Sequence, residues 1–297
     1  MPFFNKKKIL VTHNSTFHTD DLFATATLSI LCKGKIKVIR TRDVEMFKKG
    51  DFVYDVGGEY DPLRNLFDHH QEGGAGKRAN GIPYAAFGLV WKKYGAQIAG
   101  SQEIADKIDE DLVQSIDADD NGIDLYSVKN EANIKPIVIQ SIFASFRPSW
   151  TEEQDYDSRF FEVLPFVEAF LKRTIIRARD SIKAKAIVEK AYSDAPDKRL
   201  IVLDGLYSWQ KTLQQYREPL YVIFPKSGTW SLFCVRTDEN TFENRKNLPK
   251  EWAGKRDQEM AKISGVSDAV FCHNGLFLAV AKSKEGVLAL AKIALEN

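Results

Sequence analysis

Two apolar runs near the start of the chain end in histidine and aspartate, and this pattern constrains the fold more than any other feature. The run KILVT is followed by His13, and the run FVY is followed by Asp55. Such runs are typical of buried strands in a parallel sheet, and ligands bind such sheets beyond the carboxyl ends of the strands. The sequence therefore predicts an α/β fold with polar side chains at one edge of a sheet.

The segments around these runs alternate between strand and helix. We expect the first helix at Asp20–Lys33, because its acidic start favours a helix N-terminus. Strands are expected at Lys8–His13, Lys35–Thr41 and Asp51–Val56, and further helices at Pro83–Tyr94, Gln102–Ile116 and Pro136–Phe146. Strand, helix, strand, strand with short connections predicts an open, mainly parallel sheet with flanking helices.

The second half of the chain has a different organisation. Residues Glu152–Tyr192 are typical of one or two long amphipathic helices, broken near Pro165, and the DAPDK turn at Asp194–Lys198 predicts a boundary. The 297 residues suit two domains. We therefore expect an N-terminal sheet domain at 1–150, linking helices at 151–193, and a smaller C-terminal α+β domain at 194–297. Ser227-Gly228 and Asn274-Gly275 are hairpin signals in that last domain.

Composition excludes several classes of protein. The formal charge of +1 gives no global field for nucleic acid, so such a partner would need a local basic patch. The three cysteines are far apart and form no CxxC, which fits a reducing compartment. No apolar stretch is long enough to span a membrane, and only PFFNKKK lies between Met1 and the first strand. We expect a cytoplasmic protein without a membrane partner.

The histidines are concentrated near the start of the chain. Four of the five lie within the first seventy residues, each close to carboxylates, namely His13, His18, His69 and His70. Imidazole and carboxylate are ligands of divalent transition metals. Two ions about 3.5–4 Å apart can hold the attacking and leaving oxygens of a displacement. Enough donors are present for such a pair: the histidines together with Asp20, Asp55, Asp68, Asp117, Asp119 and Asp120.

These motifs resemble the DHH phosphoesterase superfamily, which includes RecJ-type exonucleases, oligoribonucleases and manganese pyrophosphatases. Within it the chain is most similar to the melanocyte-proliferating-gene (Myg) family of metal-dependent hydrolases, some of which are RNA exonucleases. The matching stretches run from near residue 12 to near residue 292: THNSTFHTDDLFATA, VYDVGGEYDPLRNLFDHHQ, DADDNGID, LPKEWAGKRDQEM and SGVSDAVFCHNGLFLAVAKSKEGVLALAK. The resemblance implies a DHH-type catalytic domain at the N-terminus and a substrate-binding domain at the C-terminus.

The resemblance also implies a set of metal ligands. It assigns one ion to His13, His18 and Asp55, and the other to Asp20, Asp55, His69 and Asp120, with Asp55 as the bridge. His70 would face the scissile phosphate, and Asp68 would orient its neighbours. Asp117 is the alternative to Asp120 as the last ligand.

One departure from the superfamily bears on the metal. Many members carry a carboxylate four positions after the first histidine, whereas here His18 stands five positions after His13, as in the Myg family's HxxxxHxDD. A site richer in imidazole favours Mn²⁺, with Zn²⁺ or Fe²⁺ as alternatives, over Mg²⁺.

The expected reaction is hydrolysis of phosphodiester bonds, as a 3′–5′ exonuclease acting on RNA or short oligonucleotides. Phosphate contacts from the C-terminal domain are expected from Arg236, Arg245, Arg256 and His273. Two alternatives stay open: a metallohydrolase of a nucleotide or pyrophosphate, and a non-catalytic, metal-containing RNA-binding regulator. A homo-oligomer is compatible with either.

Overall fold

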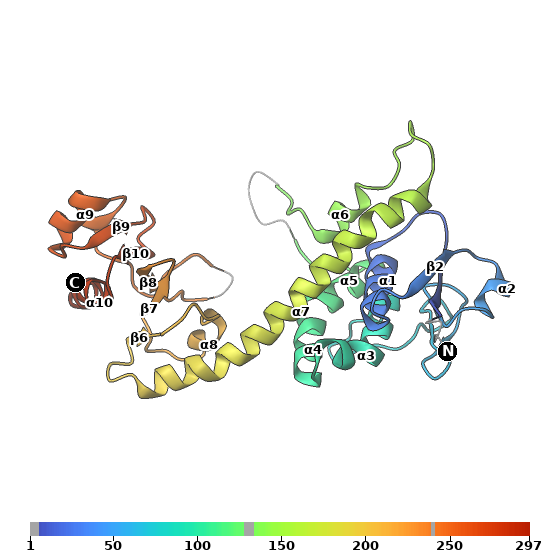
Figure 1. The fold of residues 1–297 in the computed structure, drawn as a ribbon, viewed down its shortest axis with the longest axis horizontal. Helices are drawn as coiled ribbons and strands as arrows, with labels where there is room; N and C mark the ends of the chain where they lie inside the picture. The colour runs from blue at the N-terminus through green and yellow to red at the C-terminus, as the bar shows by residue number, and fades with distance from the viewer. Residues whose placement is uncertain (1–5, 128–133, 239–240) are drawn as a thin grey trace, which may run out of the picture. The chain divides into compact units, whose positions relative to one another are not determined.

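The computed structural model describes residues 6–127, 134–238 and 241–297. The chain divides into two compact units, Met1–Arg179 and Asp180–Asn297 (Figure 1). This division lies inside the long helix α7 (Tyr156–Asp194), whereas the sequence predicted a boundary at the turn that follows it. Among the described residues, no helix has the length and apolar character to cross a membrane.

The first unit contains a five-stranded sheet in the order β2-β1-β3-β5-β4. Its strands are β1 (Lys8–Thr12), β2 (Ile36–Arg40), β3 (Phe52–Tyr54), β4 (Tyr60–Asp61) and β5 (Leu66–Phe67). β1 runs parallel to β2 and β3, β3 runs parallel to β5, and β4 pairs with β5 in the antiparallel direction. The predicted open, mainly parallel sheet is therefore confirmed.

The short helices of this unit are α1 (Thr19–Leu31), α2 (Val44–Phe47), α3 (Ala86–Ala99), α4 (Gln102–Ile108), the π-helical turn η1 (Asp109–Val113), α5 (Gln114–Asp120) and α6 (Ile139–Ala144). They pack on the sheet and on one another, with α1 against β1 and α3 against β5. α1 is buried over most of its length and packs against α3. The predicted helix Gln102–Ile116 continues through η1 and α5, which places Asp120 at the end of α5.

A buried ion pair joins the glycine-rich segment Glu72–Gly81 to these helices. Arg78 contacts Asp109 at 2.6 Å and Asp117 at 2.8 Å. The Asp117 carboxylate also accepts a hydrogen bond from the backbone N–H of Gly88, at 3.0 Å near the start of α3. Asp117 therefore links α5 to α3, and Arg78 links the glycine-rich segment to η1 and α5.

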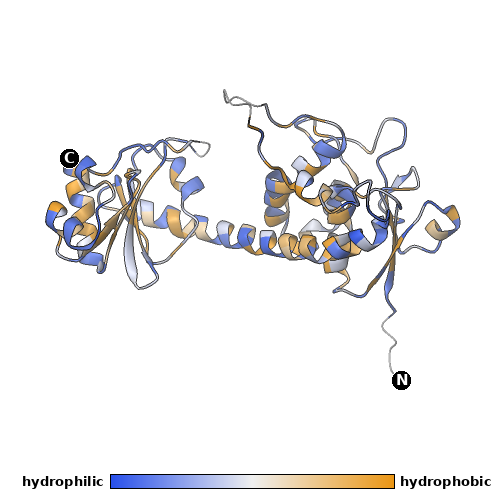
Figure 2. Ribbon diagram, turned by 90° about the horizontal axis from the view of Figure 1, so that it is seen from above, coloured by the Kyte–Doolittle hydropathy of each residue, from blue (hydrophilic) through white to orange (hydrophobic). Residues whose placement is uncertain are grey.

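Helix α7 is continuous, so the predicted break near Pro165 is wrong. Proline removes one backbone donor and clashes with the carbonyl four residues earlier, which usually kinks a helix. Here buried side chains lie on both sides of Pro165, including Phe160, Val163 and Val167, and their packing keeps the helix in one piece. Hydrophilic and hydrophobic residues alternate along α7 (Figure 2).

The second unit is built on the sheet β6-β7-β8-β10-β9. Its elements are β6 (Leu200–Val202), α8 (Gln210–Gln214), β7 (Tyr221–Lys226), β8 (Thr229–Cys234), η2 (Lys250–Trp252), α9 (Asp257–Ser264), β9 (Ala269–Cys272), β10 (Leu278–Ala281) and α10 (Lys284–Glu296). The hairpins β7–β8 and β9–β10 are antiparallel, as the Ser227-Gly228 and Asn274-Gly275 turns predict. This unit is the predicted C-terminal α+β fold.

Alternating residues of β7 build a core on each face of this second sheet. Tyr221 and Ile223 pack with α9 and α10, whereas Val222 and Phe224 pack with α8 and the end of α7. This arrangement follows from the two-residue period of a strand.

The close approach at Gly88 gives a first prediction. A Cβ atom at this position would lie 1.8 Å from Asp117 Oδ2, so Gly88→Ala must displace the buried Arg78–Asp117 pair. We expect a loss of about 1–3 kcal/mol in the free energy of unfolding, measured by denaturant titration. Lys92→Ala, on the exposed face of α3, is the control and should change the value by less than about 0.5 kcal/mol. Equal stability of the two variants would contradict the packing described.

Candidate metal centre

The first part of the centre lies at the end of β1. His13 is buried, and its Nδ1 is 3.0 Å from the carbonyl oxygen of Asn14. Because a carbonyl can only accept, Nδ1 carries a proton, which leaves Nε2 as the ring atom that can bind a metal ion. Nε2 lies 3.1 Å from Asp55 Oδ2 and 3.4 Å from Asp21 Oδ2. His13 therefore turns a ligand atom toward carboxylates.

Asp55 follows β3 and is the residue that the other groups surround. Its backbone has φ = 55°, a left-handed conformation that aspartate tolerates better than most residues. The side chain is buried, and neither of its oxygens has a hydrogen-bond partner within the described structure. Burial alone would raise the pKa of Asp55, but contacts with His13 and His69 lower it below its usual value. A buried, ionised carboxylate of this kind needs a cation.

The Asp68-His69-His70 segment follows β5, and both carboxylate oxygens of Asp68 accept hydrogen bonds. Asp68 Oδ2 accepts a hydrogen bond from the backbone N–H of Gly58, at 2.5 Å. Asp68 Oδ1 accepts from the backbone N–H of His69, at 2.8 Å, and lies 2.7 Å from His70 Nδ1. These bonds fix the segment and hold the exposed His70 ring by its Nδ1, so its Nε2 is free to meet a ligand.

His69 faces into the same group as Asp55. Its Nε2 lies 3.2 Å from Asp120 Oδ2 and 3.4 Å from Asp55 Oδ1. Burial opposes a charge on this imidazole, yet the contacts with Asp120 and Asp55 raise its pKa to about 11. In the absence of a metal ion, a proton on His69 compensates part of the negative charge.

Asp120, rather than Asp117, reaches the histidines. Besides its contact with His69, the Asp120 carboxylate lies 3.8 Å from His18 Nδ1. Asp117, one helical turn earlier in α5, is bound to Arg78 instead. Of the two residues that the sequence left open as the last ligand, Asp120 is the one that lies beside the histidines.

Two consecutive aspartates at the start of α1 complete the group. Asp20 is fully buried, and its oxygens accept hydrogen bonds from the backbone N–H groups of Ala86 (3.0 Å) and Phe87 (2.7 Å) at the start of α3. Burial, followed by repulsion from Asp120 and Asp55, raises the pKa of Asp20 well above its usual value. This carboxylate joins two helices and still faces the other acidic groups.

Asp21 belongs to the centre, although the sequence interpretation assigned it no role. Its Oδ1 accepts a hydrogen bond from the backbone N–H of His18, at 2.8 Å. Its buried Oδ2 has no hydrogen-bond partner among the described residues and lies 3.4 Å from His13 Nε2 and 3.9 Å from Arg40 Nη2. Burial raises the pKa of Asp21 to about 7. The Asp20-Asp21 doublet, which begins two residues after His18, was the signal that could have identified it.

Three groups of side chains among the described residues could each hold a divalent cation. The first is His13, His18 and Asp55, the second is Asp20, Asp55, His69 and Asp120, and the third is Asp55, Asp68, His69 and His70. Within each group, one ligand atom per residue lies within 4.8 Å of all the others. Asp55 is common to all three groups and has two oxygens without hydrogen-bond partners in the described structure. The donor set, buried position and orphaned oxygens fit a pair of metal ions.

All four residues that the sequence predicted as phosphate contacts lie in the second unit, and one of them, Arg245, binds backbone carbonyl oxygens. The Arg245 guanidinium donates to the backbone carbonyls of Gln214, Tyr216, Arg217 and Pro219, which fixes the chain after α8. Arg236 instead stacks on Phe242, and Arg256 stacks on Phe271 at 4.5 Å. His273 is exposed, and its Nδ1 accepts a hydrogen bond from the backbone N–H of Gly275. The structure therefore gives Arg245 a role in holding the chain after α8, whereas the sequence predicted a phosphate contact for it.

Comparisons with known proteins agree with the resemblance found in the motifs. The sequence matches the family model MYG1_exonuc, described as "Uncharacterised protein family (UPF0160)", over residues 9–295. MYG1 exonuclease of Homo sapiens is 30% identical over 318 residues, covering 96% of this chain and 85% of the relative. The MYG1 protein of Saccharomyces cerevisiae is 30% identical over 325 residues, covering 97% and 96% respectively.

Among solved structures, RecJ from Thermus thermophilus in complex with Mn²⁺ aligns with 98% of this chain and 52% of its own, at 13% identity and a TM-score of 0.29. Because this TM-score is too low to support a fold assignment, we assign the α/β fold from the strand order and directions described above. The sequence relatives match from end to end, which also confirms the prediction of a hydrolase-type enzyme. The chain belongs to the MYG1 family.

Proposed function

We propose that this protein is a two-metal phosphodiesterase that removes nucleotides from the 3′ end of RNA or short oligonucleotides. The observation that carries the proposal is Asp55, a buried carboxylate shared by all three groups of potential ligands. A carboxylate that bridges two ions is the usual centre of a site for in-line displacement at phosphorus. The names of the mammalian relatives, which are exonucleases, support a nucleic-acid substrate.

The ligand set also supports a choice of metal. His13 and His18 would hold one ion together with Asp55, and His69 would hold the other with the aspartates. Three imidazoles favour Mn²⁺, Zn²⁺ or Fe²⁺ over Mg²⁺, and we propose Mn²⁺. When bound, the two ions would activate a water molecule and neutralise charge on the phosphate.

The residues beside these ligands would position the substrate. His70, held through Nδ1 by Asp68, presents Nε2 to the exposed side of the centre and can donate a proton to a leaving oxygen. Arg236, Arg256 and His273 of the second unit would bind phosphates along the substrate. The predicted cytoplasmic location and homo-oligomer stay predictions.

The activity itself is the first test. With Mn²⁺ added, we expect turnover of RNA and short oligonucleotides, with release of mononucleotides, and loss of turnover after EDTA treatment. The measurement is a panel of RNA, DNA, dinucleotides and pyrophosphate with chromatographic detection of products. Turnover of pyrophosphate or nucleotides alone would favour the small-substrate alternative, and bound metal without any turnover would favour the regulatory one.

A second test concerns the bridge. Asp55→Asn removes a charge that both ions would share, so both should bind more weakly and activity should collapse. His18→Ala removes a ligand that is half-exposed and belongs to one group, so one ion should be retained. Metal content per chain, measured by mass spectrometry after desalting, distinguishes the two results. Two tightly bound ions in Asp55→Asn would exclude the bridging role.

A third test separates substrate contacts from scaffold in the second unit. Arg256→Ala should raise KM several-fold with unchanged metal content and melting temperature, since it removes an exposed cation and no ligand. Arg245→Ala should lower the melting temperature instead, because several backbone carbonyls lose their donor. Unchanged kinetics in Arg256→Ala would remove this residue from the substrate site.

A further inference from the structure

Arg147 is a cation beside the metal centre that the proposed chemistry has not used. Its Nε donates to the carbonyl oxygen of Phe17, at 2.7 Å, which ties the side chain to the loop that carries His13 and His18. Phe17 directly precedes His18, which is one of the proposed ligands. Arg147 therefore lies next to the group of proposed ligands.

The outer nitrogens of Arg147 distinguish it from the other arginines of this region. Arg40 donates to Asp157 and to the carbonyl oxygen of Ser15, and Arg78 is bound to two aspartates. Within residues 6–127, 134–238 and 241–297, by contrast, no hydrogen bond or ion pair engages Nη1 or Nη2 of Arg147. A half-buried guanidinium whose two outer nitrogens have no such partner in the described structure can donate two parallel hydrogen bonds to a phosphate.

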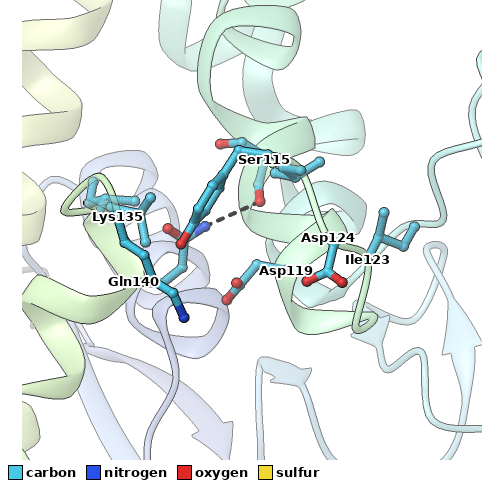
Figure 3. Close-up of a pocket in the computed structure, with 10 residues that line it drawn as sticks. Ser115, Asp119, Ile123, Asp124, Lys135 and Gln140 are labelled. Atoms are coloured by element: carbon cyan, nitrogen blue, oxygen red, sulfur yellow. Dashed lines mark hydrogen bonds between the residues drawn. The ribbon is translucent and has the colours of Figure 1, made fainter. Parts of the chain in front are cut away.

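Asp119, the neighbour of the proposed ligand Asp120, lines a pocket of about 510 Å³. Figure 3 shows Lys135 and Gln140 on one side of it and Asp119, Ile123 and Asp124 on the other. The next residue after Asp119 is the proposed ligand Asp120, and successive side chains on a helix point in different directions. One carboxylate therefore faces the metal centre while its neighbour lines the pocket.

The lining of this pocket fits a nucleobase. The half-exposed ring of Tyr126 offers a stacking surface, with Ile123 and Leu125 as apolar neighbours. The Gln140 side chain is held by its Nε2, which donates to the carbonyl oxygen of Ser115 at 3.2 Å, so its Oε1 can accept. The acceptors of the pocket, including Asp124, match the exocyclic amino groups of cytosine, adenine and guanine, which uracil lacks.

Resting on the function proposed above, we propose that the first unit contains the binding site for the terminal nucleotide. Arg147 binds the phosphate of this nucleotide beside the metal centre, and the pocket takes its base, stacked on Tyr126. The site favours bases that carry an amino group, because the acceptors Asp119, Asp124 and Gln140 outnumber the cationic donor Lys135 in its lining. Cytosine has a donor at the position where uracil has a carbonyl oxygen. The metal centre then determines where the chain is cut, and the pocket determines which terminal base is cut fastest.

The test is direct binding of small probes to the full chain loaded with Mn²⁺, by calorimetry. The probes are ribose 5-phosphate, CMP and UMP. Ribose 5-phosphate tests the phosphate contact without a base, CMP adds a base with an amino group, and UMP adds a base without one. CMP should bind about tenfold more tightly than ribose 5-phosphate, since one stacked base contributes about 1–3 kcal/mol. UMP should lie between them. Equal affinity for all three would overturn the base pocket.

Variants assign the effect to residues. Tyr126→Ala should bring CMP close to ribose 5-phosphate, and Tyr126→Phe should restore the difference, because it keeps the ring. Arg147→Gln should weaken both ligands by about tenfold, since it removes a charged phosphate donor, with metal content unchanged. Arg159→Ala, an exposed arginine paired with Glu162 in α7, is the control and should change neither affinity.

Turnover of oligonucleotides separates this inference from the proposed function. Faster removal of terminal C than of terminal U, with the preference lost in Tyr126→Ala, supports the nucleotide site. Oligonucleotide turnover without a base preference, together with equal binding of the three probes, overturns the site and leaves the exonuclease function intact. Base-selective binding without any oligonucleotide turnover supports the site and contradicts the exonuclease function.

Discussion

The carboxylate of Asp55 is the group on which the rest of this structure depends. It is buried at the end of β3, its backbone takes a left-handed conformation, and neither oxygen has a hydrogen-bond partner in the described structure. Burying an uncompensated carboxylate is costly, and the effective cost after relaxation is still several kcal/mol per ion. Three further aspartates, Asp20, Asp21 and Asp120, lie in the same group, so the cost rises with each one. A pair of divalent cations would offset the repulsion between these carboxylates, because each carboxylate would then be attracted to a metal ion.

The fold brings these charges together with backbone groups rather than with cationic side chains. Asp20 is held by two N–H groups at the start of α3, and Asp68 is held by N–H groups of Gly58 and His69. The N-terminus of α3 favours the negative charge of Asp20, and each oxygen of this carboxylate keeps a second lone pair beside its hydrogen bond. Arg78 is bound to Asp117 and Asp109 and leaves the centre itself without an internal lysine or arginine partner within the described ranges, apart from the 3.9 Å approach of Arg40 to Asp21. This design keeps lone pairs available for metal ions.

Sequence reasoning located most of this centre because its signals are local. A strand followed by His13, a second strand followed by Asp55 and the Asp-His-His motif each place a side chain at the carboxyl edge of a parallel sheet, whatever the rest of the chain does. The structure brings together the side chains that the motifs grouped. Long-range packing decided what local patterns could not, such as the continuity of α7 through Pro165. Two arginines also depend on residues that are distant in sequence. Arg245 donates to backbone carbonyls after α8, and Arg147 donates through Nε to the carbonyl oxygen of Phe17.

The central claim is that Asp55 bridges two metal ions, and the most direct measurement is a crystal structure of the Mn²⁺-loaded protein with anomalous scattering at the manganese edge. The account predicts two anomalous peaks about 3.5–4 Å apart, one on each side of the Asp55 carboxylate. One peak should lie beside His13 and His18, and the other beside Asp20, His69 and Asp120. A single peak, or two peaks of which one does not contact Asp55, would contradict the account.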